Sequence, residues 1–136
     1  MISMTELLSG NILTDLPQEH QDNLTKLQVI INKVRILWGK PMTITSGYRS
    51  VEQHLKIYSD KGITDKNKIP MKSKHLIGAA CDIADEGLVL TAWLKANPQI
   101  MEDCNIFCEA WNSNWSHIQF LPFGSYKPGQ TRWFNP

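Results

Sequence analysis

The sequence predicts a single α+β domain over residues 1–136, with helices first and a small antiparallel sheet behind them. In the first third of the chain, apolar side chains recur at three- and four-residue steps, which is typical of a helix. Later, short apolar or alternating runs lie between turn residues, which is typical of strands. A chain of 136 residues can bury a core without disulfides, and no repeat or low-complexity tract divides it.

The longest helix is expected from Pro17 to about Trp38, because proline is favoured in a first turn. Its apolar stripe comprises Leu24, Leu27, Ile31, Val34 and Trp38. Ser50 and Gln53 form a capping-box pattern that opens a second helix through roughly Asp60. Leu88 to Ala96 is expected to form a third helix.

Four strands are expected over 42–45, 79–84, 106–109 and 116–121. The last two flank the turn residues Asn112, Ser113 and Asn114. Residues 61–74 form a polar, lysine-rich loop, and loops of this length in a compact domain are usually functional or mobile. The segment from Pro122 to Pro136 is aromatic, basic and rich in turn residues.

Composition and charge exclude several classes of function. The net charge of +1 gives no basic face for a nucleic-acid partner, and no apolar run reaches the length of a membrane span. The first residues lack the pattern of a signal peptide, so we expect synthesis in a cytoplasm. Cys81, Cys104 and Cys108 are an odd set without a paired framework and are expected to be small buried hydrophobic residues.

The segment from Ser73 to Asp82 indicates a metal site. His75 and Asp82 are seven residues apart, and Gly78 with the alanines after it would let a turn bring the two side chains together. Further on, His117 lies on an expected strand. Two imidazoles and one carboxylate would leave a tetrahedral zinc ion with one open position, as in catalytic sites. Each residue taken alone is more often an ordinary surface or core residue.

The segment Ser46-Gly47-Tyr48-Arg49-Ser50 follows the first expected strand. It can be a plain strand-to-helix turn with an exposed arginine. Alternatively, the Arg49 guanidinium lies near the metal, where it would bind a peptide carboxylate or polarise a carbonyl group. Because either structure needs the same turn residues, this segment alone does not distinguish them.

Together, these segments resemble the zinc peptidases of the M15 family, which include D-alanyl-D-alanine carboxypeptidases and phage L-alanyl-D-glutamate endopeptidases. The family pattern of Ser-Gly-Tyr-Arg, Ser-x-His-x-x-Gly-x-Ala-x-Asp and Trp-x-His is matched at residues 46–49, 73–82 and 115–117. The resemblance covers about residues 41–119. It implies the α+β fold that these peptidases share with the hedgehog signalling domain, and the peptide stem of peptidoglycan as substrate.

By this resemblance, the zinc ligands correspond to His75, Asp82 and His117. Arg49 corresponds to the substrate-orienting arginine, and Ser73 to a residue that braces the site. Trp115 would line the substrate cleft beside the second histidine. The expected cofactor is one zinc ion per chain, and the chain is expected to act as a monomer.

The chain departs from the family pattern at Asn114, where many members carry their catalytic acid. An amide cannot exchange a proton as a carboxylate does, so the chain is either inactive or takes its base from elsewhere. Glu109 is the candidate, because a three-residue hairpin loop would place it opposite His117. Alternatively, Glu109 only pairs with a cation or braces a ligand. Glu102 and Asp103 are weaker candidates on an expected helix.

The resulting hypothesis is zinc-dependent hydrolysis of an amide bond in peptidoglycan, by a carboxypeptidase or an endolysin-type endopeptidase. The enzyme would act on the cell wall after release from a phage- or prophage-carrying host. The alternatives are a non-catalytic zinc module that binds cell wall or protein, and a virion or tail component. His20 and His54 are expected on helix surfaces, and the tryptophans mostly in the core.

Overall fold

Five short strands form one mixed sheet in the computed structural model, which describes all residues 1–136. The strand order is β1-β2-β4-β3-β5. The strands are β1 (Ile44–Ser46), β2 (Ala80–Ala84), β3 (Phe107–Glu109), β4 (Trp115–Gln119) and β5 (Trp133–Phe134). The first four pair antiparallel, and β5 pairs parallel to β3. The predicted α+β class is confirmed, although the sheet is not purely antiparallel.

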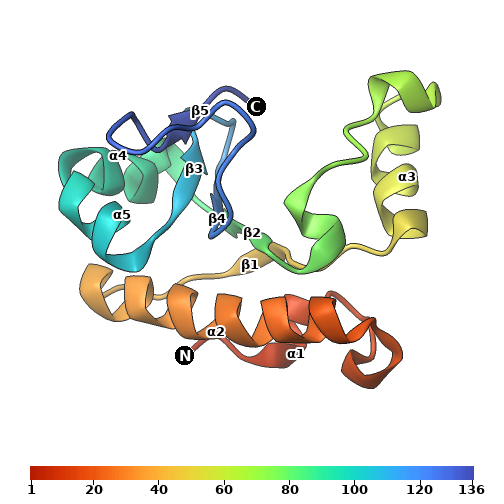
Figure 1. The fold of residues 1–136 in the computed structure, drawn as a ribbon, viewed down its shortest axis with the longest axis horizontal. Coiled ribbons are helices and arrows are strands. Elements are labelled where there is room, and N and C mark those ends of the chain that lie inside the picture. Colours follow the sequence, from red (N-terminus) through yellow and green to blue (C-terminus); the bar gives the residue numbers. More distant parts are fainter.

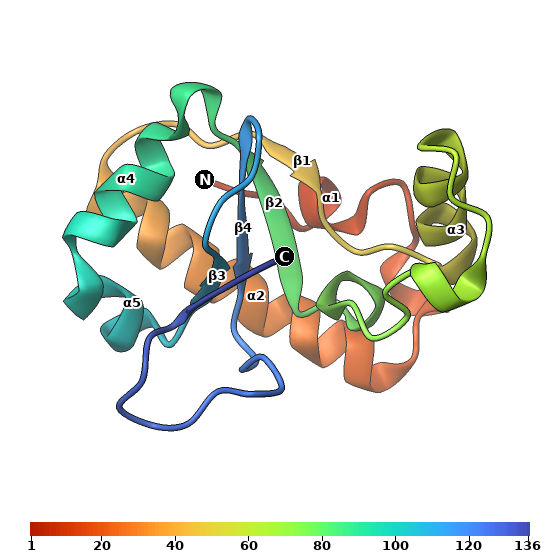
Figure 2. The same ribbon diagram turned by 90° about the horizontal axis from the view of Figure 1, so that it is seen from above.

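Five helices surround this sheet, and none of them is long and apolar enough to cross a membrane. They are α1 (Met4–Leu8), α2 (Gln18–Trp38), α3 (Val51–Asp60), α4 (Val89–Ala96) and α5 (Pro98–Cys104). In Figure 1, α2 runs beneath the sheet, α4 and α5 lie on one side of it, and α3 stands on the opposite side. Seen from above in Figure 2, the chain after β4 loops outward and returns across β3 and β4.

The predicted helices are confirmed in position. In α2, Leu24, Leu27, Ile31 and Val34 are fully buried, and the helix ends at Gly39, whose φ of 77° lies in the left-handed region. Ser50 caps α3 through the predicted capping box with Gln53. The core joins these helical residues to the sheet through Ile83 and Ile118.

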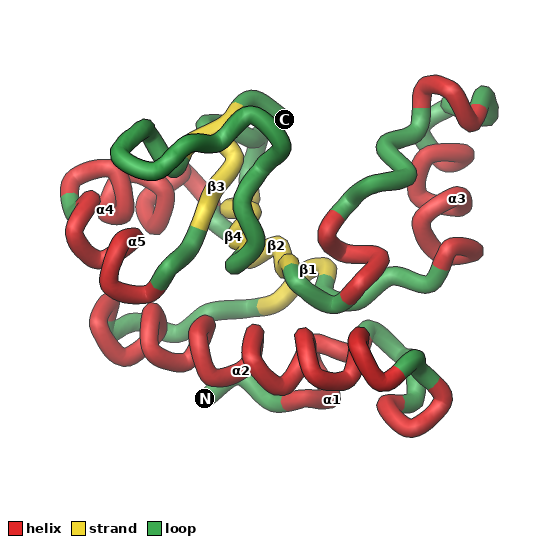
Figure 3. Tube along the Cα trace, viewed as in Figure 1, coloured by secondary structure: helices red, strands yellow, loops and turns green.

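Three local features differ from the sequence-based expectations. Helix α1 was not expected, and its short length explains why periodicity gives little signal there. Strand β5 was not expected either, because its two residues lie in a turn-rich tail. The first strand begins two residues later than expected, at Ile44. The segment between α3 and β2 is mostly loop, as expected, but contains short 3-10 helices over Lys66–Lys68 and Lys74–Ile77, the second called η3 below (Figure 3).

The cysteines and tryptophans have different outcomes. All three cysteines are free and buried, as expected, and burial raises the pKa of the Cys81 and Cys108 thiols. The expectation that the tryptophans lie in the core was wrong for Trp111, which is 63% exposed. Trp93 and Trp133 are only partly buried against the core.

Candidate metal centre

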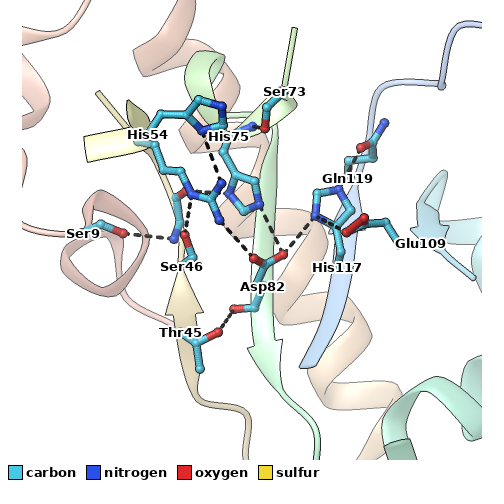
Figure 4. Close-up of polar contacts among 12 residues, drawn as sticks. Ser9, Thr45, Ser46, His54, Ser73, His75, Asp82, Glu109, His117 and Gln119 are labelled. Atoms are coloured by element: carbon cyan, nitrogen blue, oxygen red, sulfur yellow. Dashed lines mark hydrogen bonds and ion pairs between the residues drawn. The ribbon is translucent and has the colours of Figure 1, made fainter. Parts of the chain in front are cut away.

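The sheet and one short 3-10 helix bring two histidines and an aspartate together. Asp82 lies in the middle of β2, and His117 is its direct partner across the antiparallel pair with β4. His75 comes from η3, which leads into β2. In Figure 4, these three side chains point toward one another from neighbouring elements. The three predicted metal ligands are therefore adjacent in space, although 42 positions separate the first from the last.

The two histidine nitrogens of this cluster converge on one oxygen of Asp82. Its Oδ1 lies 2.9 Å from His117 Nδ1 and 3.2 Å from His75 Nε2. One ligand atom from each residue lies within 4.8 Å of the others, and all three residues are buried. Such an arrangement can hold a metal ion.

Both histidines have their second ring nitrogen bound to an acceptor. His75 Nδ1 donates to the carbonyl oxygen of Gly47 at 2.8 Å, and His117 Nε2 donates to Gln119 Oε1 at 2.8 Å. The orientation of the Gln119 amide is itself set, because its nitrogen donates to the Leu121 carbonyl at 2.7 Å. These contacts assign the proton of each neutral imidazole to the nitrogen that faces away from Asp82.

These tautomers determine whether the cluster can bind a metal ion, because they decide which ring nitrogens carry a free lone pair. In the neutral state, His75 Nε2 and His117 Nδ1 both present a lone pair toward an Asp82 oxygen that is also an acceptor. Three acceptors that face one another need a cation among them, either a proton or a metal ion. Metal-bound histidines usually donate their other ring nitrogen to an acceptor of this kind. The chemistry of the donor set therefore fits a divalent metal.

Without a metal, protons fill this role. Burial alone would raise the pKa of Asp82, but hydrogen bonds with His117 and His75 outweigh it and lower that pKa below its usual range. Burial alone would likewise lower the pKa of His117, but its hydrogen bond with Asp82 and the charges of Asp82 and Glu109 raise it. The site therefore favours an ionised carboxylate beside a cationic partner.

Arg49 lies on the other side of Asp82. Its Nη2 is 3.4 Å from Asp82 Oδ2, and its Nε donates to Ser46 Oγ at 2.9 Å. The Arg49 side chain is 13% exposed, so the alternative of an exposed turn arginine was wrong. The expectation for His54 was also wrong, since it is fully buried and its Nδ1 lies 3.4 Å from Arg49 Nη1.

Glu109 is placed beside the cluster by the pairing of β3 with β4. Cys108 lies opposite Ile118, and the next residues along this register are Glu109 and His117. Glu109 Oε1 is 3.4 Å from His117 Nδ1, the same nitrogen that faces Asp82. By contrast, Glu102 and Asp103 are exposed on α5. Of these three carboxylates, only Glu109 contacts the cluster.

The remaining predicted residues lie at the edge of the site. Ser73 caps η3, where its Oγ accepts a hydrogen bond from the His75 backbone at 3.3 Å. Trp115 begins β4, on the same face as His117 two residues later, and is partly buried. Asn114 is exposed in the preceding turn, where its carbonyl accepts from Asp85 N.

Three residues of the site were missed by sequence reasoning. Gln119 follows His117 at the two-residue step of a strand, so this signal was available in the sequence. Gly47 contributes its backbone carbonyl, and because every residue has one, its role cannot be recognised from the residue type. His54 lies in a segment whose helical pattern gives no reason to expect a buried imidazole.

Comparisons of this chain with protein-family models, with curated proteins and with solved structures found no match.

Proposed function

We propose that this chain is a zinc-dependent peptidase that hydrolyses an amide bond in the stem or cross-link peptides of peptidoglycan. One observation carries the proposal: two histidines with fixed tautomers, Asp82 and a further carboxylate, Glu109, meet at one buried point. Two nitrogen ligands and one oxygen ligand form a donor set that suits zinc and leaves a position open. The family resemblance of the three motifs supplies the substrate class.

Glu109 is the proposed base and acid. Bound zinc would act as a Lewis acid on water and on the scissile carbonyl. Glu109 Oε1 lies on the side of His117 Nδ1, from which it can accept the proton of the attacking water and return it to the leaving amine. Asn114 need not supply this function, since its side chain belongs to the exposed turn.

Arg49 is the proposed substrate-orienting residue. Its guanidinium is nearly buried and lies against Asp82, so a bound peptide carboxylate would meet a fixed cation beside the metal position. Ser73 holds η3, and Trp115 borders the site next to His117. We also infer that the fold belongs to the hedgehog and DD-peptidase type, because helix α2 covers a small sheet that carries the ligands.

The experiment compares zinc content and cleavage of purified muropeptides by the wild-type chain and by Glu109→Gln. We expect near-stoichiometric zinc in both proteins, and cleavage by the wild type alone. General-base removal lowers rates by about 10² to 10⁴-fold. Mass analysis of the products identifies the bond, and so separates carboxypeptidase from endopeptidase action. Glu102→Gln is the matched control, because Glu102 is exposed on α5.

Two outcomes would overturn this proposal. A wild-type protein that binds no zinc would remove its basis. Zinc without cleavage would favour the alternative of a non-catalytic module that binds cell wall or a protein partner, or that belongs to a virion. Full activity in Glu109→Gln would refute the assignment of the base alone.

A further inference from the structure

His54 is a buried polar residue to which the proposed reaction assigns no role. It lies in the second turn of α3 and is 0% exposed. A buried imidazole needs a partner at each ring nitrogen, and both partners of His54 are present. One of them is Arg49, and the other is the backbone of the segment between α3 and η3.

The two contacts define the protonation of His54. Its Nε2 lies 3.0 Å from the Pro70 carbonyl oxygen, which can only accept, so Nε2 carries the proton. Nδ1 faces Arg49 Nη1, which can only donate, at 3.4 Å. His54 is therefore a neutral imidazole that accepts from Arg49 and donates to Pro70.

The surroundings favour this neutral state. Burial lowers the pKa of His54, and the charges of Arg49 and His75 lower it further. The hydrogen bond to Pro70 acts in the opposite direction without reversing the shift. The geometry and the charge environment thus agree on an acceptor at Nδ1.

This acceptor changes how Arg49 meets Asp82. A guanidinium whose only partner is a carboxylate tends to form two parallel hydrogen bonds with it. Here Arg49 makes a single 3.4 Å contact with Asp82 Oδ2, while Ser46 Oγ and His54 Nδ1 bind its other nitrogens. Two elements, β1 through Ser46 and α3 through His54, therefore hold the arginine away from a full ion pair with Asp82.

We propose that His54 is a positioning residue that fixes the Arg49 guanidinium for recognition of a substrate carboxylate. Through Pro70, it also ties Arg49 to the loop that leads to His75. Recognition of a substrate carboxylate by Arg49 rests on the proposed function, whereas the positioning of Arg49 by His54 does not.

Two substitutions separate the contacts of His54. The amide of His54→Gln reaches the place of Nε2 and can still donate to Pro70, but it offers no acceptor at the place of Nδ1. His54→Asn has the opposite property, since its amide oxygen takes the place of Nδ1 and its short side chain cannot reach Pro70. Each variant loses one buried hydrogen bond, so both are expected to lower Tm. Thr91→Val is the control for such a loss, because it removes the buried bond from Thr91 Oγ1 to Asp85 far from Arg49.

The first readout is independent of activity. Because Arg49 Nη1 is the atom that donates to His54, we expect a slowly rotating, resolved Arg49 Nη1–H signal in the ¹⁵N-labelled protein. This signal should persist in His54→Asn and Thr91→Val and be lost in His54→Gln. The second readout is kcat/KM on a synthetic stem peptide, which should fall by about 10- to 100-fold in His54→Gln and be largely restored in His54→Asn. In an Arg49→Ala background, His54→Gln should have no further effect.

The outcomes separate this inference from the proposed function. An unchanged Arg49 signal in His54→Gln, or equal kcat/KM losses in the Gln and Asn variants, would overturn the positioning role. If the wild type cleaves no stem peptide but His54→Gln still loses the Arg49 signal, the proposed function fails and the positioning role stands. Should the variants not fold, the ¹⁵N spectrum of wild-type His54 decides, because a proton on Nδ1 at pH 7 contradicts the inference.

Discussion

The two halves of the candidate site are held in place by different means. In the sheet half, Asp82, His117 and Glu109 lie on β2, β4 and β3, and backbone pairing sets their spacing. In the loop half, His75 and Arg49 lie on connecting segments. The His75 side chain is directed by one hydrogen bond to Gly47. The Arg49 side chain is directed by one hydrogen bond each to Ser46 and His54. The sheet half should therefore tolerate the loss of a single side-chain contact better than the loop half.

Asp82 belongs to both halves, so Asp82→Asn should have the largest effect. Its Oδ1 meets both histidines and its Oδ2 meets Arg49. Removing the charge of a buried ion pair costs about 3–5 kcal/mol of stability, and here it also removes a metal ligand. Chemical denaturation should show this loss in the metal-free protein, and calorimetric titration should show zinc binding too weak to measure. Retained zinc binding would mean that Asp82 is not a ligand.

Gly47→Ala tests the loop half. A Cβ at this position would overlap the backbone of Leu7, whose carbonyl accepts a hydrogen bond from Tyr48 at 2.7 Å. Overpacking of this kind costs about 1–3 kcal/mol, and the displaced Gly47 carbonyl no longer directs His75. We expect a lower Tm together with weaker zinc binding. Gly124→Ala is the control, because a Cβ there meets nothing within 4 Å.

Gln119→Leu tests the sheet half. It removes the acceptor that directs His117 Nε2, while the pairing of β4 with β2 stays in place. Loss of such a partner lowers metal affinity by about 10- to 100-fold. We expect this change in zinc titrations with a smaller drop in Tm than for Gly47→Ala. The contrast between the halves fails if Gln119→Leu is the more destabilising of the two.

The dependence of stability on pH should change sign when zinc binds. In the metal-free protein, the pKa of His117 is higher in the folded state than in the unfolded state, where it is about 6.5. Protonated His117 therefore stabilises the fold below about pH 6.5, and this contribution is lost as pH rises through the pKa of the folded state. With zinc bound, protons compete for the imidazoles, so stability is lost as pH falls. Denaturation curves with and without zinc between pH 5.5 and pH 8.5 measure both slopes. Equal slopes would exclude His117 as a ligand.

Ser73→Ala should have the smallest effect. It removes the side-chain cap of η3, which is worth about 1 kcal/mol. His75 keeps its bond to Gly47, so zinc content should stay unchanged while Tm falls slightly. A large loss of zinc in this variant would show that the loop half depends on its cap more than on the Gly47 carbonyl.

Much of the fold follows from local patterns in the sequence. The stripe along α2, the capping box of α3 and the apolar run of β2 each predict an element that the structure contains. The hairpin turn around Asn112 also predicts that Glu109 comes close to His117, and the two lie 3.4 Å apart. Helix α1 and strand β5 escape such patterns, because five and two residues are too few for a period to show.

The sequence by itself determined which residues could bind a metal, because imidazoles and carboxylates are recognisable by type and spacing. Only the tertiary structure decided how they are oriented. The Gly47 carbonyl directs His75 because α1 packs against that turn, and His54 is buried because the 61–74 loop covers α3. Hydrogen bonds to backbone carbonyls depend on how distant segments pack, and a backbone carbonyl has no residue type for a sequence to reveal.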